Sequence, residues 1–205
     1  MVDDFFNSLL RLKSKLVYAG GVCGRWGIDH NSDTAIWFHL VTKGKGWVHY
    51  PSRPRPTPIA EGDVAVFMPH AEKRYLSYSP REFVPDDPNA RDTRFDEGTT
   101  GFVCAVIELG LPKASLWQVL PPEILIRSNE ADRILADLIR HAIAEAHQQR
   151  FGSFSVVEHL CDNIFVLTLR SYIERGLVAQ SVFGAMQDRR VETVLSLIHR
   201  EPWCA

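Results

Sequence analysis

The chain has 205 residues, of which 45% are hydrophobic and 23% are charged, and both shares are ordinary for a folded globular protein. Its 23 Lys and Arg residues against 25 Asp and Glu residues give a formal charge of −2. This balance argues against autonomous nucleic-acid binding, which needs a basic excess to neutralise phosphates. No uncharged apolar run approaches the length of a membrane span, and Cys23, Cys104, Cys161 and Cys204 form no C-x-x-C pair. A reduced, cytoplasmic protein is therefore expected.

In chain order, the apolar spacing of residues 4–12 predicts a short N-terminal helix. From residue 16 to about residue 109, short apolar runs alternate with Gly, Pro and Asp, which is typical of a sandwich or barrel of short strands. The clearest strand runs are residues 35–42, 46–50, 64–68, 74–78 and 102–109. Gly44 can take a positive φ between the first two runs, so a hairpin is expected there. Residues 51–58 and 80–98 are rich in proline and are expected as loops.

After Pro121-Pro122 the apolar period changes from two residues to about 3.6, which indicates helices. A first helix is expected after a cap at Ser128 or Asn129, and its apolar face consists of Ile134, Leu135, Leu138, Ile139, Ala142, Ile143 and Ala146. A second is expected from Ser155, with Glu158 completing a capping box, to Arg175. It is apolar on nearly all sides, so the rest of the fold or a second copy must cover it. A third is expected from Asp188, and this order of strands before helices predicts an α+β architecture.

The strand-rich half resembles the core motifs of cupin barrels, in which a strand, a glycine turn and a returning strand are followed by Gly-Asp and a closing proline. The residues that carry this resemblance are Phe38-His39-Leu40-Val41, Gly44, Trp47, Gly62-Asp63 and Pro69. The helical half resembles the ligand-binding region of AraC-family transcription regulators. Its matching residues are Leu120-Pro121-Pro122, Gly152, Leu169-Arg170, Asp188-Arg189-Arg190-Val191 and Ile198-His199-Arg200-Glu201-Pro202-Trp203. The resemblance covers roughly residues 16–205.

This resemblance implies an α+β fold in three parts. A cupin-like β-barrel (double-stranded β-helix or jelly roll) with the N-terminal helix takes residues 1–120, a helical dimerisation and linker segment takes 121–186, and the start of a DNA-binding region takes 187–205. It implies a small-molecule effector in the barrel, a homodimer through helices 129–175, and DNA binding only through a domain beyond this chain. No catalytic role is expected, because hydrolase, phosphate-loop and dinucleotide motifs do not occur in the sequence.

The candidate pocket residues lie on or beside the expected strands, and they are Trp26, Trp37, His39, Trp47, Met68 and Arg74. The aromatic groups suit an apolar or aromatic effector, and the fork of Arg74 or Arg25 suits a carboxylate. The alternative is that the tryptophans only fill the barrel and that the arginines form surface salt bridges. A filled barrel would leave a dimerisation module that binds no effector.

A metal site is the other alternative, because many cupins hold a divalent metal with three histidines and one glutamate. By spacing to Gly44, Trp37 stands at the glutamate position, and Arg74 stands at the closing histidine position. The remaining candidate ligands for zinc or nickel are His39, His70, Cys23 and Cys104. With them the chain would be a metal-dependent enzyme of the dioxygenase or isomerase type. A nucleophilic role for Cys23 or Cys104 needs a partnering base that the sequence does not identify.

Overall fold

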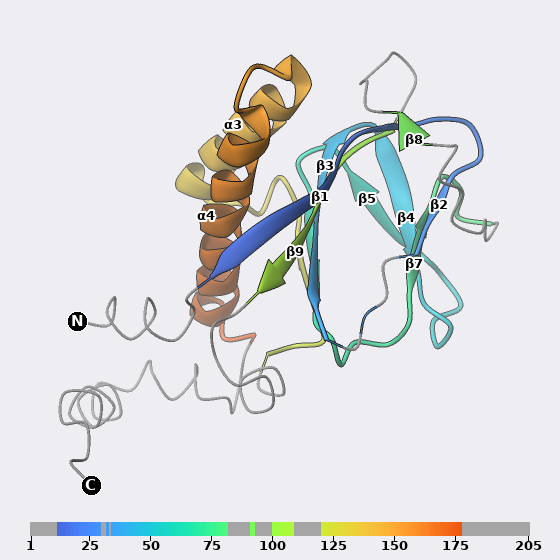
Figure 1. Ribbon diagram of the computed structural model, residues 1–205. Coiled ribbons are helices and arrows are strands. Elements are labelled where there is room, and N and C mark those ends of the chain that lie inside the picture. Colours follow the sequence, from blue (N-terminus) through green and yellow to red (C-terminus); the bar gives the residue numbers. More distant parts are fainter. Residues whose placement is uncertain are drawn as a thin grey trace, which may run out of the picture.

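The computed structural model describes residues 12–29, 32, 34–81, 91–92, 100–108 and 120–177. Two antiparallel sheets face each other and form the barrel, with two helices against one side (Figure 1). The larger sheet has the strand order β10-β6-β3-β9-β1-β8, and the smaller has the order β2-β7-β4-β5. The strands are β1 (Lys13–Val22), β2 (Gly27–Ile28), β3 (Ile36–Lys43), β4 (Lys45–His49), β5 (Thr57–Ala60), β6 (Val64–Phe67), β7 (Tyr75–Ser77), β8 (Arg91–Asp92), β9 (Thr100–Glu108) and β10 (Glu123–Ile126).

The five expected strand runs are confirmed as β3, β4, β6, β7 and β9. The expected hairpin of β3 with β4 is wrong, because β3 pairs with β6 and β9 whereas β4 pairs with β5 and β7 in the other sheet. Gly44 does have a positive φ, of 73°. Its carbonyl accepts a hydrogen bond from the Glu61 N–H at 3.0 Å. The glycine turn therefore carries the chain from one sheet to the other.

The larger sheet continues past the expected barrel boundary at residue 120, because β10 pairs with β6 along its whole length. The connection after β10 is tied to the turn before β6 through Asp63. The Asp63 carboxylate accepts hydrogen bonds from the N–H of Ala60 and of Ser128, at 3.0 and 2.9 Å, and pairs with Arg127 at 2.9 Å. Asp63 thus binds backbone amides on both sides of this junction.

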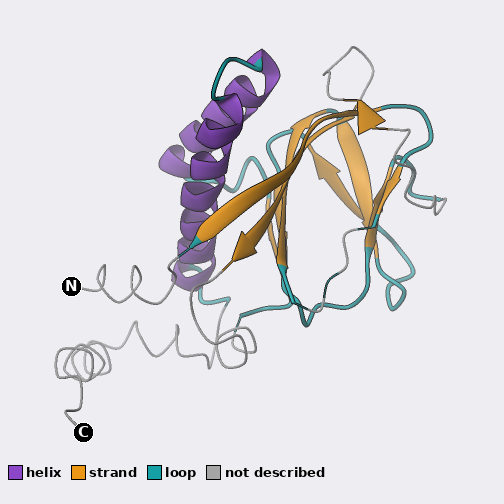
Figure 2. Cartoon of the chain, viewed as in Figure 1, coloured by secondary structure: helices purple, strands orange, loops and turns teal. Residues whose placement is uncertain are grey.

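Alternation along the strands of the larger sheet separates two hydrophobic cores. On β3, Phe38 and Leu40 face the helices, whereas His39 and Val41 face the interior between the sheets. The first core is shared with the helices on the outer face of the larger sheet (Figure 2). The second core fills the barrel and contains Trp26 and Phe102. Any small-molecule site inside the barrel is therefore built from the second set.

The two described helices are α3 (Arg133–Gln148) and α4 (Ser153–Glu174). The cap of α3 is Asp132 and not Ser128 or Asn129, because its carboxylate accepts from the Leu135 N–H at 2.9 Å. The apolar face of α3 is confirmed at Leu135, Ile139, Ala142 and Ala146, whereas Ile134 is exposed. The third expected helix, from Asp188, lies outside the described residues, as does most of the expected N-terminal helix.

The expected capping box of α4 is wrong, because the helix begins at Ser153 after Gly152, which has a φ of 83° and provides no side-chain cap. Glu158 instead accepts a hydrogen bond from the Leu16 N–H at 2.8 Å, and Asp162 accepts from the Ser14 N–H at 2.7 Å. Two carboxylates of α4 thus bind backbone donors of β1. The expected cover of the helix comes from α3, β1, β9 and β10.

Gly46 of β4 packs tightly inside the barrel, and replacing it is expected to destabilise the fold. A Cβ added at this position would lie 2.8 Å from Cη2 of Trp26 and 3.2 Å from the Ser77 carbonyl oxygen. Gly46→Ala should therefore lower the free energy of unfolding by about 1–3 kcal/mol in urea denaturation. Adding Trp26→Phe removes the clashing ring and should recover part of the loss; an unchanged stability of the single variant would contradict this packing.

Candidate functional site

The centre of the barrel interior is built around His39 of β3. His39 is 1% exposed, and its ring stacks on Trp37 with the ring centres 6.1 Å apart and an angle of 8°. Phe67, on the neighbouring strand β6, has its ring centre 5.7 Å from that of His39. Trp37 and Phe67 are directly paired positions of β3 and β6. These three rings form one aromatic layer of the interior.

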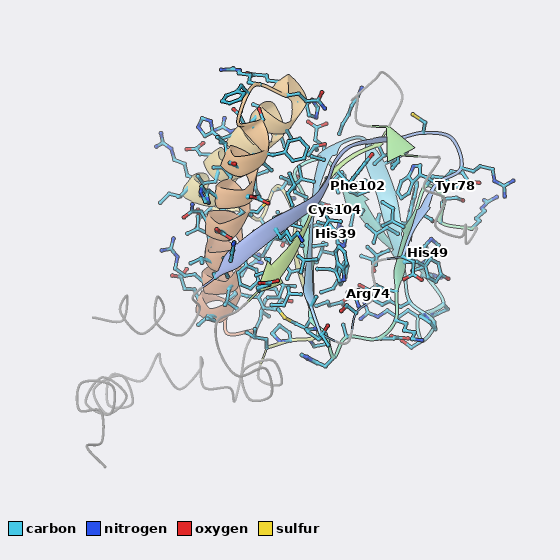
Figure 3. All side chains as sticks on the ribbon, viewed as in Figure 1. His39, His49, Arg74, Tyr78, Phe102 and Cys104 are labelled. Carbon is cyan, nitrogen blue, oxygen red and sulfur yellow. The ribbon has the colours of Figure 1, made fainter. Side chains whose placement is uncertain are left out.

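Strand β9 pairs with β3 on the side away from β6, and Cys104 of β9 is directly opposite His39 in this pairing. Nδ1 of His39 lies 3.2 Å from Sγ of Cys104, and both side chains are buried. Further along β9, Phe102 meets Trp26 edge to face at 5.4 Å. Figure 3 shows the labelled residues Phe102, Cys104, His39 and Arg74 following one another from the upper to the lower end of the barrel.

Arg74 precedes β7 and is buried at the lower end of this series, with 2% of its surface exposed. Its guanidinium carbon lies 4.3 Å from the ring centre of Phe67, and Nη1 donates to the Glu72 carbonyl at 3.4 Å. Burial lowers the pKa of Arg74 to about 10, so the side chain still carries its positive charge at neutral pH. A buried cation beside aromatic rings favours an anionic group at the same place.

Tyr50 and Glu123 form a second polar group near Arg74. The Tyr50 hydroxyl donates to Glu123, and Arg53 binds the same carboxylate at 2.7 Å while lying 4.0 Å from the Tyr50 ring centre. Burial, together with the Glu123 carboxylate, raises the pKa of Tyr50 well above its ordinary value. Tyr50 therefore stays a neutral donor near Arg74. Sequence reasoning missed Tyr50, which stands at the end of an expected strand, and Glu123, which follows Pro121-Pro122 where helices were expected to begin.

The structure brings Trp26, Trp37, His39 and Arg74 to the barrel side of the strands and places the other two candidates elsewhere. Trp47 is only partly buried, outside the barrel core, with Lys45 Nζ 5.9 Å from its ring centre. Met68 belongs to the core that faces the helices, because its neighbour Phe67 points into the barrel. Arg25 is exposed.

The metal candidates do not come together as a set. His70 and Cys23 are exposed, which leaves only His39 and Cys104 in contact. Within the described part of the chain, no group of three or more His, Cys, Asp or Glu residues is placed to hold a metal ion. Trp37 offers no ligand atom and Arg74 is itself a cation, so the residues at these two positions do not fit the metal set of cupins.

A serine and histidine pair on the smaller sheet has a structural role. Nε2 of His49 lies 2.8 Å from Oγ of Ser77 and 2.9 Å from the Ser79 carbonyl oxygen, and the Ser77 hydroxyl also donates to that carbonyl at 2.8 Å. Because a carbonyl only accepts, Nε2 carries a proton and is not a base for Ser77. The pair fixes the end of β7.

Comparison with known proteins finds one matching family model and two curated relatives. Residues 8–174 match the family model Cupin_6, described as cupin. An uncharacterized HTH-type transcriptional regulator of Haemophilus influenzae is 26% identical over 187 residues, which cover 87% of this chain and 61% of the relative. The HTH-type transcriptional regulator MtrA of Neisseria gonorrhoeae is 25% identical over 87% of this chain and 62% of its own length. The chain thus spans about three fifths of both relatives.

Among solved structures, ToxT of Vibrio cholerae strain SCE256 with a bound unsaturated fatty acid is similar with a TM-score of 0.42 and 12% identity. The match covers 97% of this chain and 66% of that one. In the described part of the chain, neither helix has the length and apolar character needed to cross a membrane.

Proposed function

Because the chain belongs to the cupin family, in the form found at the N-terminus of AraC-type regulators, we propose that it is the effector-sensing part of a transcription regulator. Both curated relatives are HTH-type transcriptional regulators, and they extend beyond the region that matches this chain. In this proposal the DNA contacts belong to a helix-turn-helix domain, and the protein acts in the cytoplasm without catalysing a reaction.

The observation that carries the proposal is the buried Arg74 beside the aromatic layer of Trp37, His39 and Phe67. A guanidinium group binds a planar anion through two parallel hydrogen bonds, and aromatic rings favour apolar surface. We therefore propose an effector that combines an apolar or aromatic body with one anionic group such as a carboxylate. In this arrangement Arg74 binds the anion and the rings contact the body.

We propose that β1 transmits the binding of an effector in the barrel to the helices. Tyr18 of β1 packs against the barrel core, and the nearby Ser14 and Leu16 donate their backbone N–H groups to Asp162 and Glu158 of α4. A shift of β1 when an effector enters would change these two hydrogen bonds. The equilibrium between two positions of α4 would then depend on the effector.

Asp162→Ala is expected to weaken this connection and to lower the free energy of unfolding by about 1–2 kcal/mol, because a charge-assisted hydrogen bond to a partly buried backbone donor is lost. Chemical denaturation measures the loss. Arg170→Ala on the same helix is the matched control, because Arg170 is exposed. Equal stability of the two variants would show that Asp162 does not hold β1.

We propose that α3 and α4 also form the surface of a homodimer. Three large apolar side chains on these helices are exposed, namely Ile134, Phe154 and Val156. Exposed apolar side chains on a helix surface favour association with a second copy. Sedimentation of the purified chain should show a dimer that Phe154→Glu weakens; a monomer at all concentrations would contradict this part of the proposal.

The effector proposal is tested by titrating the purified chain with octanoate and benzoate while recording tryptophan fluorescence. Trp26 and Trp37 lie in or beside the barrel core, so a bound molecule should change their emission. The uncharged amides octanamide and benzamide are the matched controls. A saturable change with the acids and a much weaker one with the amides supports the proposal. Equal responses to acids and amides would contradict the role of Arg74.

A further inference from the structure

The three described cysteines lie in three different environments. Cys23 is exposed, Cys161 of α4 is buried in the core between the larger sheet and the helices, and Cys104 of β9 is buried in the barrel core. Burial raises the pKa of the Cys161 thiol well above its ordinary value, which makes this thiol unreactive. Of the two buried thiols, only Cys104 has a histidine ring nitrogen 3.2 Å from its sulfur atom among the contacts of the described residues.

The geometry of the Cys104 and His39 pair is fixed by the sheet. The two residues are direct partners on the adjacent strands β3 and β9, so the register alone brings their side chains together on the barrel side. The imidazole ring is held in place by stacking on Trp37 and by Phe67. A thiol, a base within reach of its proton, and a group that orients the base are the parts of an activated nucleophile.

The protonation chemistry of this pair favours proton transfer during a reaction rather than before it. In the tautomer that carries its proton on Nε2, Nδ1 of His39 accepts the proton of the Cys104 thiol. An apolar barrel disfavours a free thiolate, so the proton stays on sulfur at rest. When an electrophile reaches the sulfur atom, His39 can remove the proton as the new bond forms.

We propose that Cys104 is a nucleophile that captures electrophilic small molecules of the α,β-unsaturated carbonyl class inside the barrel. The inference rests on the proposed function, because the electrophile must enter the effector site. Sγ forms a bond to the β carbon of the electrophile, and the electron pair of the double bond moves toward the α carbon. His39 takes the thiol proton and returns it to the α carbon. The product is a thioether, and the step needs no oxidant or other reactant.

The position of Arg74 selects among such electrophiles. Phe67 contacts both the guanidinium group of Arg74 and the ring of His39, so Arg74, which precedes β7, and His39 of β3 lie close together in the barrel interior. An unsaturated molecule that also carries a carboxylate would therefore place its anion on Arg74 and the rest of its body toward Cys104. Phe67 thus joins the proposed anion site at Arg74 to His39, the base of the proposed covalent site.

The test uses the 205-residue chain carrying Cys23→Ser and Cys204→Ser, with N-ethylmaleimide as the electrophile. Intact mass and peptide mapping give the rates at Cys104 and Cys161. We expect Cys104 to react at least about 100-fold faster than Cys161 in the folded chain, and His39→Gln to slow Cys104 by about 10-fold or more. In 8 M urea the two rates should become similar and the effect of His39→Gln should disappear, which shows that the difference comes from the fold.

Equal rates at Cys104 and Cys161 in the folded chain, or no effect of His39→Gln on a stable fold, would overturn the inference. His39→Asn provides a second variant if the glutamine side chain disturbs the barrel. Measuring octanoate binding to the same preparation distinguishes failure of the covalent inference from failure of the proposed effector-binding function. If octanoate binds and Cys104 stays unmodified, the covalent inference fails while the proposed function stands; if neither reagent enters, both fail.

Discussion

Arg74→Met is expected to weaken the binding of octanoate or benzoate by about 100-fold. Removing the guanidinium leaves the buried carboxylate of the ligand without its charged partner, which costs about 2–4 kcal/mol of binding free energy. Methionine keeps the apolar stem and a similar volume, so the loss reports the charge. Isothermal titration calorimetry of wild type and variant measures the affinity ratio.

Arg53→Met is the matched control for this prediction, because Arg53 also lies near Tyr50 and Glu123 but its side chain is 44% exposed. It should change the affinity for octanoate by less than about threefold, since an exposed ion pair contributes little. The affinity for octanamide should be similar in wild type and in Arg74→Met. An affinity for octanoate that is equal in wild type and in Arg74→Met would place the anion elsewhere.

Replacing Arg74 should not destabilise the empty protein. Burial lowers the pKa of this guanidinium, so folding disfavours its charged form relative to the unfolded chain. Arg74→Met is therefore expected to unfold at the same or a higher urea concentration than wild type. A gain in stability with a loss of octanoate binding is the combination expected of a residue kept for ligand recognition.

Asp63→Ala is expected to lower the free energy of unfolding by about 3 kcal/mol, among the largest effects of a single polar residue in this chain. Asp63 is 4% exposed and holds the N–H groups of Ala60 and Ser128 together with the Arg127 side chain. Its removal leaves partly buried donors without their acceptor and separates the turn before β6 from the chain that follows β10.

Asp63→Asn distinguishes the contribution of the carboxylate charge from that of the hydrogen-bond acceptor. Its amide oxygen can still accept one of the backbone hydrogen bonds. We expect it to lose about half as much stability as Asp63→Ala. Asp132→Ala, which removes only the cap of α3, should cost about 1 kcal/mol and serves as a reference for a partly exposed carboxylate. Urea denaturation of all three variants measures the series. If Asp63→Ala lowers the free energy of unfolding by less than about 1 kcal/mol, Asp63 does not hold the turn before β6 to the chain that follows β10.

Local pattern predicted the strand positions well, because alternation and turn residues act within a few positions along the chain. It placed Trp37 and His39 on one face of a strand, and the structure agrees. It failed at Met68, because residues 67 and 68 are neighbours and only the register of β6 decides which of them points into the barrel. The partner of β4 was missed for a related reason, since Gly44 gives a change of direction but not the sheet in which the next strand pairs.

The candidate site was predicted only in part, because its polar contacts join residues that are distant in sequence. Cys104 was identified without a base, and His39 was identified without the contact to Cys104, which is 65 positions further along the chain. Glu158 matched a local capping pattern, yet its carboxylate binds the backbone of β1. In both cases a long-range contact, which no local pattern encodes, decided the role of the residue.

The most direct test of the effector site is native mass spectrometry of the purified chain mixed with octanoate, compared with Arg74→Met under the same conditions. We expect one octanoate per chain for the wild type, no such adduct for Arg74→Met, and none for either protein with octanamide. Equal adducts in wild type and Arg74→Met, or a wild type that takes up no octanoate, would show that Arg74 does not bind the effector.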